Sequence, residues 1–352
     1  MRKTPLALSL PFLLCTLAHA ASFDCTKAKT VQEKAICVSP QLSAADDQMA
    51  AAYKAWLAAA QPDWAAGIRQ NQLVWLRTRD ASCPAGDANN PIESCLGNIY
   101  KLRIDELQQM VQHFAGVTFV SQAITLTARD TPDSVPAGMS EITPGFGTLE
   151  ALLPQVGLTA PQWAAWNHAV ENAAIQAVNT FTGDAKKPAQ DWSSLVLPGV
   201  DDVMTVSVDG FDGKMVSATI VNDYDGHGAH PVENSAKFYW MLDKQRALKP
   251  EDVFLPNSGW DTWMEQRLDS YLHKALDAQS DGNYQSWFPQ GGAATALQGI
   301  VTNPGDWNLQ PVGFSIFFQP YQVACYACTP DPMIIPWSDL KPYLQPGFVL
   351  PQ

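Results

Sequence analysis

Basic residues are scarce in this chain of 352 residues, which carries 22 lysines and arginines against 35 aspartates and glutamates and a net charge of -13. A protein that binds nucleic acid needs a basic surface to neutralise phosphates, so the charge balance excludes that class. Anionic membrane surfaces repel an acidic chain for the same reason. Hydrophobic residues make up 46% of the sequence, which excludes disorder as the main state. The chain therefore folds, and its length allows roughly two domains.

Long hydrophobic runs are also missing, apart from a short one at the N-terminus. Two basic residues precede an apolar run over residues 6–17, which ends in Ala18-His19-Ala20. Such a run is too short to span a bilayer core of about 30 Å. A basic start, a short apolar run and small residues at a cleavage site are typical of a secretory signal peptide. We therefore expect residues 1–20 to be removed and the product to be periplasmic or secreted.

Cysteine is infrequent, with seven in the chain. Removal of the signal peptide takes Cys15 away and leaves an even number, which in an oxidising compartment predicts disulfides. Four cysteines lie in the first hundred residues and allow three pairings, and two form a close pair near the end. From proximity in sequence we predict the bonds Cys25–Cys37, Cys83–Cys95 and Cys325–Cys328.

Helical periodicity marks the region from residue 22 to about 113. Apolar residues recur at helical spacing in three stretches, and Pro40 is suited to begin the first of them. A helical unit this small has a modest core, which disulfides would help to stabilise. We predict a small all-α, disulfide-linked domain over residues 21–113.

After His113 the pattern changes to alternating apolar residues, which are typical of half-exposed strands. The stretch from Pro132 to Pro161 is rich in proline and glycine and is expected to be an irregular loop. We predict an α+β domain over residues 114–352, with a mainly antiparallel sheet and helices. The strand patterns cover residues 203–208, 236–242 and 312–318, and the helical patterns cover residues 163–181 and 260–275.

Acidic charge is concentrated in the second of these domains. Residues 21–113 hold ten acidic and nine basic residues, whereas residues 114–352 hold 25 and 11, a net charge of -14. An acidic surface favours a cationic partner, mainly through association rate and specificity. It also keeps an exported protein soluble. The charge alone leaves both explanations open.

A series of short motifs accompanies the cysteines of the N-terminal region. In order they are Phe23-Asp24-Cys25, Glu33 to Cys37, Leu42, Asp46, Tyr53, Gln72, Trp75-Leu76, Arg79-Asp80, Cys83, Cys95-Leu96, Tyr100, Arg103-Ile104 and Leu107. This order resembles the small exported domain of the lysozyme inhibitor LprI family and covers residues 23–107. The resemblance implies lysozyme inhibition as one activity. Most of these residues also have a structural interpretation, as core residues or as an Arg79–Asp80 ion pair.

The second domain carries its own ordered motifs. They are Asp223 to Pro231, Phe238-Tyr239-Trp240, Leu248 to Phe254, Phe317 to Tyr321, Tyr326-Ala327 and Ile334 to Leu340. This order looks like the extracellular domain of the anti-sigma factor RsiV, which binds lysozyme, and similar domains accompany some peptidoglycan deacetylases. The likeness covers roughly residues 195–345. The chain departs from it at His227, which is added to the turn, and at Cys325 and Cys328.

The resemblance to RsiV implies that two loops contact a partner, Tyr224–Pro231 and Pro320–Pro332. We expect Tyr321 and Tyr326 to be the anchors, because tyrosine is enriched at binding hot spots. Alternatively, Tyr321 belongs to the core at a strand end. The complete set of predicted partner-binding residues is Tyr224, His227, His230, Tyr321 and Tyr326.

Catalytic motifs are missing from the sequence. There is no Gly-x-Ser-x-Gly and no glycine-rich phosphate loop. The spacing of His227 and His230 in a glycine-rich segment is not that of a zinc enzyme and indicates a turn. Cys325 and Cys328 have the spacing of a redox dithiol, but the prolines that follow disfavour the helix N-terminus that would lower a thiolate pKa. We expect no enzymatic activity, no cofactor and no metal.

Together these observations predict an exported protein that binds a basic partner, lysozyme, and inhibits it to protect the cell wall. Two alternatives stay open. One is a redox or chaperone-like protein that uses Cys325 and Cys328. The other is a cell-envelope module that binds peptidoglycan or another glycan by stacking sugars on tryptophans. The candidate tryptophans are Trp260, Trp263, Trp287 and Trp307.

Overall fold

The computed structural model describes residues 21–84, 91–129, 146–181, 191–226, 228, 230–277 and 292–349. The chain forms two compact units. The first comprises the residues up to Ala55 together with Val74–Gln108, and the second comprises Trp56–Leu73 and Gln109–Gln352. Each unit is therefore built from two separate pieces of the sequence. The predicted signal peptide lies outside the described residues.

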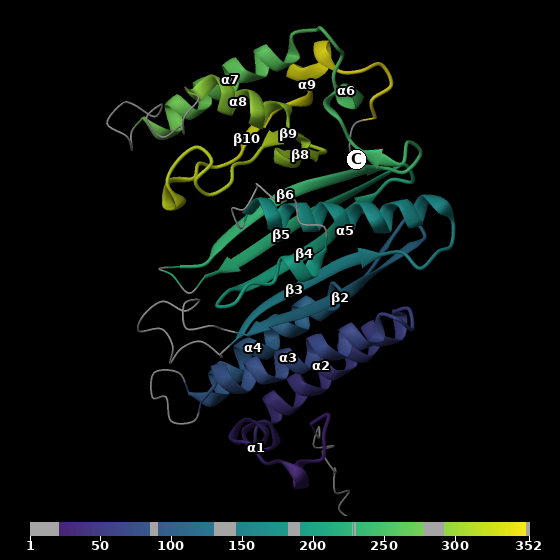
Figure 1. Cartoon of the computed structure of the whole chain (residues 1–352), viewed down its shortest axis with the longest axis vertical. Coiled ribbons are helices and arrows are strands. Elements are labelled where there is room, and N and C mark those ends of the chain that lie inside the picture. Colours follow the sequence, from purple (N-terminus) through teal and green to yellow (C-terminus); the bar gives the residue numbers. More distant parts are fainter. Residues whose placement is uncertain are drawn as a thin grey trace, which may run out of the picture. The chain divides into compact units, whose positions relative to one another are not determined.

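The N-terminal helices lie where the sequence predicts them (Figure 1). The longest begins at Pro40, as expected for a proline in the first helical turn. Within the described ranges, no helix is both long and apolar enough to cross a membrane. The elements are η1 (Cys25–Lys27), α1 (Val31–Val38), α2 (Pro40–Ala59), α3 (Ala65–Ser82) and α4 (Ile92–Gln108).

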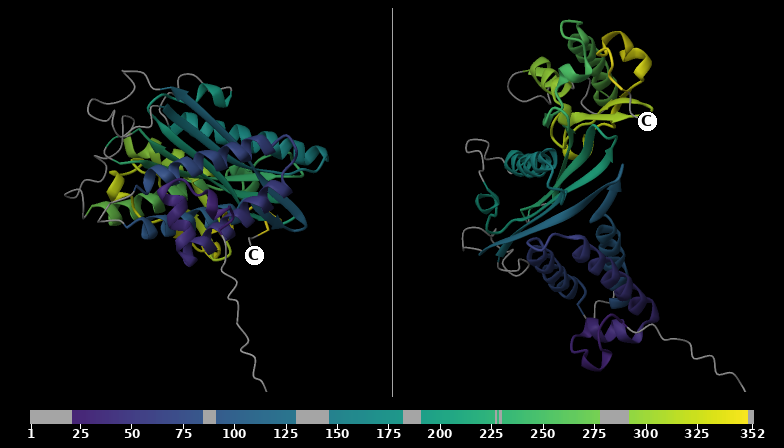
Figure 2. Two further views of the ribbon diagram at one scale, coloured as in Figure 1. Left: turned by 90° about the horizontal axis from the view of Figure 1, so that it is seen from below. Right: turned by 90° about the vertical axis from the view of Figure 1, so that its right-hand side faces the viewer.

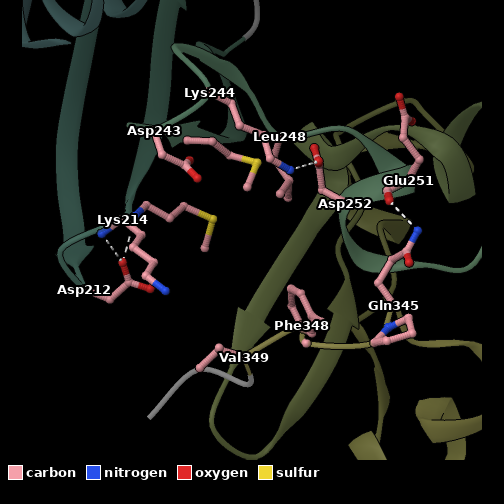
Figure 3. Close-up of a pocket in the computed structure, with 14 residues that line it drawn as sticks. Asp212, Lys214, Asp243, Lys244, Leu248, Glu251, Asp252, Gln345, Phe348 and Val349 are labelled. Atoms are coloured by element: carbon pink, nitrogen blue, oxygen red, sulfur yellow. Dashed lines mark hydrogen bonds and ion pairs between the residues drawn. The ribbon is translucent and has the colours of Figure 1, made fainter.

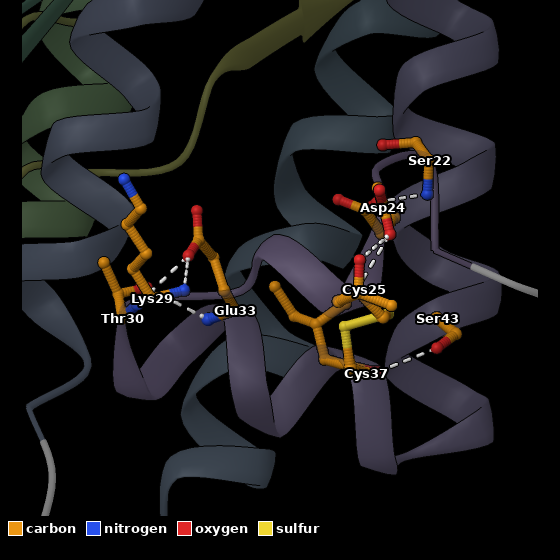
Figure 4. The surroundings of a disulfide bond; sticks show 11 residues. Ser22, Asp24, Cys25, Lys29, Thr30, Glu33, Cys37 and Ser43 are labelled. Carbon is orange, nitrogen blue, oxygen red and sulfur yellow. Dashed lines mark hydrogen bonds between the residues drawn. A yellow bond between two sulfur atoms is a disulfide. The ribbon is translucent and has the colours of Figure 1, made fainter.

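Two disulfides and a capping box fix the ends of these helices. Cys25–Cys37 joins η1 to α1 (Figure 4). Cys83–Cys95 joins the end of α3 to α4, so both predicted pairings are confirmed. At the start of α1 the Glu33 amide donates to the Thr30 hydroxyl at 3.1 Å, and the Thr30 amide donates to the Glu33 carboxylate at 3.0 Å. These bonds satisfy amide groups that the first turn of a helix leaves free.

A buried chain of polar groups crosses the first unit. Arg79 donates to the Tyr100 hydroxyl at 3.0 Å, and this hydroxyl donates to the Asp46 carboxylate at 2.7 Å. The second oxygen of Asp46 accepts from the Ser22 amide at 2.7 Å. Arg79 also forms the expected ion pair with Asp80, at 2.6 Å. Burial raises the pKa of Tyr100 above its ordinary value, and the nearby Asp46 charge adds to the effect.

The second unit contains a seven-stranded sheet in which each strand neighbours the next one along the chain. All neighbours are antiparallel except β3 and β4, so the predicted mainly antiparallel sheet is confirmed. The strands are β1 (Val111–Phe114), β2 (Val117–Arg129), β3 (Phe146–Gln155), β4 (Asp201–Phe211), β5 (Met215–Asp225), β6 (Val232–Met241) and β7 (Arg246–Ala247).

Helix α5 (Pro161–Phe181) covers one face of this sheet (Figure 2). It lies in the connection between β3 and β4, the one parallel pair, which needs such a crossover. Trp166, Val170 and Ala174 recur at helical spacing and are buried against alternate residues of β3 to β6. Alternate positions on β4 and β5 therefore face this core.

Two expectations from the sequence are wrong. Residues Phe146–Gln155, expected to be part of an irregular loop, form β3. Leu149, Ala151 and Leu153 alternate toward the α5 core, but the prolines and glycines around them masked this pattern. Strand β1 also begins at Val111, inside the region expected to be helical.

The C-terminal part of the second unit adds helices and a three-stranded sheet in the order β10-β9-β8. Trp260 and Trp307 are buried in its core, which rules both out as exposed platforms for sugars. Trp287 lies outside the described residues. The elements are α6 (Pro250–Val253), α7 (Trp260–Leu276), α8 (Gly292–Thr302), η4 (Pro304–Asp306), β8 (Trp307–Gln310), β9 (Gly313–Ile316), η5 (Tyr326–Cys328), β10 (Met333–Ile335), α9 (Trp337–Leu340) and η6 (Lys341–Tyr343).

Candidate partner-binding site

Residues predicted to contact a partner lie together at one end of the seven-stranded sheet. Tyr224 lies at the end of β5, His230 precedes β6, and Tyr321 and Tyr326 follow β9. The ring centroids of His230 and Tyr326 are 4.4 Å apart, and those of Tyr321 and Tyr326 are 5.9 Å apart. His227 lies outside the described residues. We call Tyr224, His230, Tyr321 and Tyr326 the aromatic cluster.

The two expected anchors are accessible. Tyr321 is 57% exposed and Tyr326 is 39% exposed, so the alternative that Tyr321 belongs to the core is wrong. Tyr321 has a φ of 63°, in the left-handed region that residues other than glycine seldom adopt. Such a conformation persists only where neighbouring structure holds it in place.

Gln319 supplies part of that support. Its side-chain oxygen accepts from the Ser235 amide at 2.8 Å, and its side-chain nitrogen donates to the Ser235 carbonyl. The Gln319 amide in turn donates to the side chain of Gln322 at 2.9 Å. These bonds attach the segment that carries Tyr321 to the edge of β6. Gln112 makes the same pair of bonds with the main chain of Val208, at 3.0 and 3.1 Å.

The Cys325–Cys328 disulfide closes a short loop around Tyr326. Residues Tyr326–Cys328 form only a 3-10 turn, and the Thr329 hydroxyl donates to the Tyr326 carbonyl at 3.1 Å. A turn this short lacks the regular helix N-terminus that lowers a thiolate pKa. The bond therefore fits a structural role, in which it limits the movement of Tyr326.

A cavity of about 420 Å³ opens beside the aromatic cluster. Its lining is largely aromatic and apolar, but it includes the side chain of Asn234, which is only 8% exposed. The lining residues are Tyr224, Val232, Asn234, Gln319, Pro320, Tyr321 and Gln322.

A buried carboxylate lies on the same face of the sheet. Strand register pairs Asp202 with Tyr224 and Asn222 with Asn234, so these four side chains share one face. Asn222 donates to one oxygen of Asp202, whereas the other oxygen of Asp202 and the side-chain oxygen of Asn222 are buried without a described partner. Burial raises the pKa of Asp202 to about 6, against the effect of the Asn222 hydrogen bond.

The raised pKa of Asp202 predicts a pH dependence of stability, because the folded protein holds this proton more tightly than the unfolded chain. The contribution of the protonated group is fully present below about pH 4 and is lost as the pH rises through about 6. We expect Asp202→Asn to remove this loss and to stabilise the protein at pH 7.5 by on the order of 1–3 kcal/mol. Urea unfolding at several pH values measures the free energy of unfolding of the parent and the variant. The exposed Asp243→Asn makes the same charge change, and an equal gain there would contradict the role of burial.

A second cavity, of about 410 Å³, lies at the opposite ends of β5 and β6 (Figure 3). Two of its carboxylates, Asp252 and Asp212, already have partners. Asp252 lies 2.6 Å from both Lys244 and Arg246, and Asp212 accepts from the amides of Lys214 and Met215. The Arg246 hydrogen bond above all holds the pKa of Asp252 far below its usual range. The cavity beside the aromatic cluster is therefore the better candidate site.

The segment from Asp223 to His230 contains both carboxylates and imidazoles. Among the described residues, no group of three or more histidines, cysteines, aspartates or glutamates is arranged to hold a metal ion. Asp223 and Asp225 lie in β5, and His230 precedes β6.

Sequence reasoning missed Asn234 and Gln319, which line the cavity, and Asn222, which pairs with Asn234 in the sheet. Asn222 and Asn234 occupy positions in β5 and β6 whose neighbours two residues away, such as Ile220 and Ala236, are apolar. A polar residue at a strand position whose neighbours face the core was the signal in the sequence that could have identified both asparagines. Gln319 gave none, because its partner Ser235 is 84 residues away in the sequence.

Comparison with known families gives two matches in different parts of the chain. Residues 25–107 match the family described as Lysozyme inhibitor LprI, which confirms the N-terminal resemblance. Residues 251–338 match DUF3298, a protein family of unknown function. No curated protein matches the chain.

Two solved structures of DUF3298 family proteins are similar to the chain. One, from Pseudomonas aeruginosa PAO1, has 13% sequence identity and a TM-score of 0.47, and the match covers 67% of this chain and 98% of that one. The other, from Bacteroides fragilis NCTC 9343, has 14% identity and a TM-score of 0.44, and covers 67% of this chain and 96% of that one.

Proposed function

We propose that the protein is exported, binds lysozyme and inhibits it. The observation that carries this proposal is the match of residues 25–107 to the lysozyme inhibitor family. The three disulfides fit an oxidising compartment such as the periplasm or the cell exterior. The resemblance of the second domain to the lysozyme-binding domain of RsiV supports the same partner for the second unit.

Charge around the aromatic cluster suits a basic partner. Strand register places Asp201 beside Asp225 and Asp223 beside Glu233, at the end of the sheet that carries the cluster. Lysozyme is small and strongly basic, so these acids favour encounter and orientation. Inhibition then requires no chemistry, because a protein that covers roughly 1,600 Å² in a standard interface can exclude substrate from the enzyme.

Lysozyme activity on bacterial cell walls, followed by turbidity, tests this function. We expect the mature protein to slow lysis in proportion to its concentration. We also expect calorimetry to show an affinity that falls steeply with salt, since exposed charges are screened beyond about 8 Å at physiological ionic strength. The assay uses the full mature chain. A fragment that begins at residue 114 would lack residues Trp56–Leu73, which belong to the second unit. Retention on insoluble peptidoglycan with no effect on lysozyme would assign the protein to the glycan-binding class instead.

The tyrosine anchors make a separate prediction. Tyr321→Ala and Tyr326→Ala should each weaken lysozyme binding by more than about 1 kcal/mol, while the melting temperature stays near that of the parent protein. Val312→Ala removes another exposed apolar side chain and serves as the control. Unchanged affinity in both tyrosine variants would exclude the aromatic cluster from the interface.

A further inference from the structure

We propose that Asp306 is a positioning residue of the candidate site, whose carboxylate holds the segment Gln319–Gln322 and thereby sets the orientation of Tyr321. This inference rests on the proposed function, because Tyr321 is a predicted contact for lysozyme. It is carried by hydrogen bonds that join one buried carboxylate to the glutamines on both sides of Tyr321. The two glutamines also line the cavity beside that tyrosine.

Asp306 is itself fixed in place. It lies in η4 and is 5% exposed. Its amide donates to the Asn303 carbonyl at 3.0 Å, and its carbonyl accepts from the Phe317 amide at 3.1 Å. The carbonyl of the next residue, Trp307, accepts from the Tyr239 hydroxyl on β6 at 3.1 Å. The carboxylate is therefore a fixed point beside the segment that follows Phe317.

Three side-chain amides surround this carboxylate. Asn303 donates to one of its oxygens at 3.0 Å, and the Gln322 side chain donates to the same oxygen at 3.4 Å. The side chain of Gln319 forms a further hydrogen bond with the group. Burial raises the pKa of Asp306 to about 6, against the effect of these bonds, so the group is ionised at pH 7.5. An ionised carboxylate only accepts hydrogen bonds, which suits three donors.

The backbone at Tyr321 needs support from its surroundings. Its φ of 63° lies in the left-handed region, which costs free energy that neighbouring contacts must offset. The Gln322 amide donates to the Gln319 carbonyl at 3.1 Å, and the Gln319 amide donates to the Gln322 side-chain oxygen at 2.9 Å. These two bonds close a turn around Tyr321, but they attach the turn to nothing outside it.

Two anchors outside the turn hold its two ends. Before Tyr321, the Gln319 side chain bonds to the main chain of Ser235 on β6. After Tyr321, the Gln322 side chain bonds to Asp306 in η4. With both ends held, Tyr321 is oriented before the partner arrives, and a preorganised side chain loses less conformational entropy on binding. Because Asp306 is buried, its loss should weaken binding through Tyr321 and not through a lost contact of its own.

A double-mutant cycle on the full mature protein at pH 7.5 tests this role. Asp306→Asn replaces one acceptor oxygen with a donor nitrogen among the surrounding donors, and should weaken lysozyme binding by about fivefold or more. In the Tyr321→Ala background the same substitution should change the affinity by less than about twofold, because the side chain that it orients is gone. A residue that only stabilised the fold would lower the affinity equally in both backgrounds.

The ring resonances of Tyr321 give a readout that does not need lysozyme. They are identified by their loss in Tyr321→Ala, and Asp306→Asn should shift them toward those of an unrestrained tyrosine. Asp243→Asn makes the same charge change at an exposed position and should leave them in place. If Asp306→Asn does not fold, Gln322→Glu replaces it, because it keeps the oxygen that accepts from the Gln319 amide and removes the donor to Asp306.

The two measurements separate this role from the proposed function. Unchanged Tyr321 resonances in the variant, or equal losses of affinity with and without Tyr321, would overturn the positioning role of Asp306 and leave lysozyme binding standing. Shifted resonances in a protein that does not bind lysozyme would refute the proposed function and leave the positioning of Tyr321 by Asp306 intact.

Discussion

Asp46→Ala is expected to destabilise the protein by about 3–5 kcal/mol, because it removes an acceptor from the buried polar chain of the first unit. Asp46 is 2% exposed and accepts hydrogen bonds from the Tyr100 hydroxyl and the Ser22 amide. Without it the Tyr100 hydroxyl and the Ser22 amide lose this acceptor, while Arg79 keeps its ion pair with Asp80. Urea unfolding followed by circular dichroism measures the change.

Neighbouring substitutions make this result specific. Asp47→Ala removes the same charge from the next position of α2, where the side chain is only half-buried, and should cost less than about 1 kcal/mol. Asp46→Asn keeps an acceptor oxygen and should fall between the two. Equal small losses at Asp46 and Asp47 would show that the buried chain does not stabilise the unit. If the expectation holds, lost inhibition in Asp46→Ala reflects unfolding and not a lost lysozyme contact.

Gly67→Ala is expected to destabilise the second unit by at least about 1–3 kcal/mol, the usual cost of overpacking. A Cβ atom at Gly67 would lie 2.1 Å from the carbonyl oxygen of Ala123 on β2, and a main-chain oxygen cannot move aside without disturbing its strand. Thermal unfolding measures the effect. The helical control Gly97→Ala meets no atom within 4 Å and should gain about 0.5–1 kcal/mol from helix propensity. A Gly67→Ala protein as stable as its parent would contradict this close approach.

Local signals explain which parts of the fold were predictable. A proline at a first helical turn, apolar spacing in α4 and cysteines twelve residues apart act over short stretches, so the sequence alone indicates them. The membership of Trp56–Leu73 in the second unit depends instead on distant contacts. The Trp56 indole, for example, donates to the Ser121 carbonyl at 2.7 Å, across 65 residues of sequence. No periodicity in the helix reports such a partner.

The candidate site was likewise predictable only where the sequence itself carried a signal. Tyr321 and Tyr326 came from the resemblance to RsiV, and the structure places their rings near each other. The cavity beside Tyr321 could not be predicted, because it depends on the register that sets Tyr224 opposite Val232 and on a glutamine that bonds to a remote strand.

The two glutamine side chains that bond to strand main chain have a further consequence. An open strand edge offers unpaired amides and carbonyls to any other extended chain, which makes it a starting point for aggregation. Gln319 occupies both groups of Ser235 on β6, and Gln112 occupies both groups of Val208 on β4, beyond the last pairing of β4 with β3 at Thr205. At these two positions a side-chain amide takes the place that a foreign strand would need. The molecule can therefore present an acidic, aromatic surface to a partner while these sites stay closed to edge-to-edge association with its own copies.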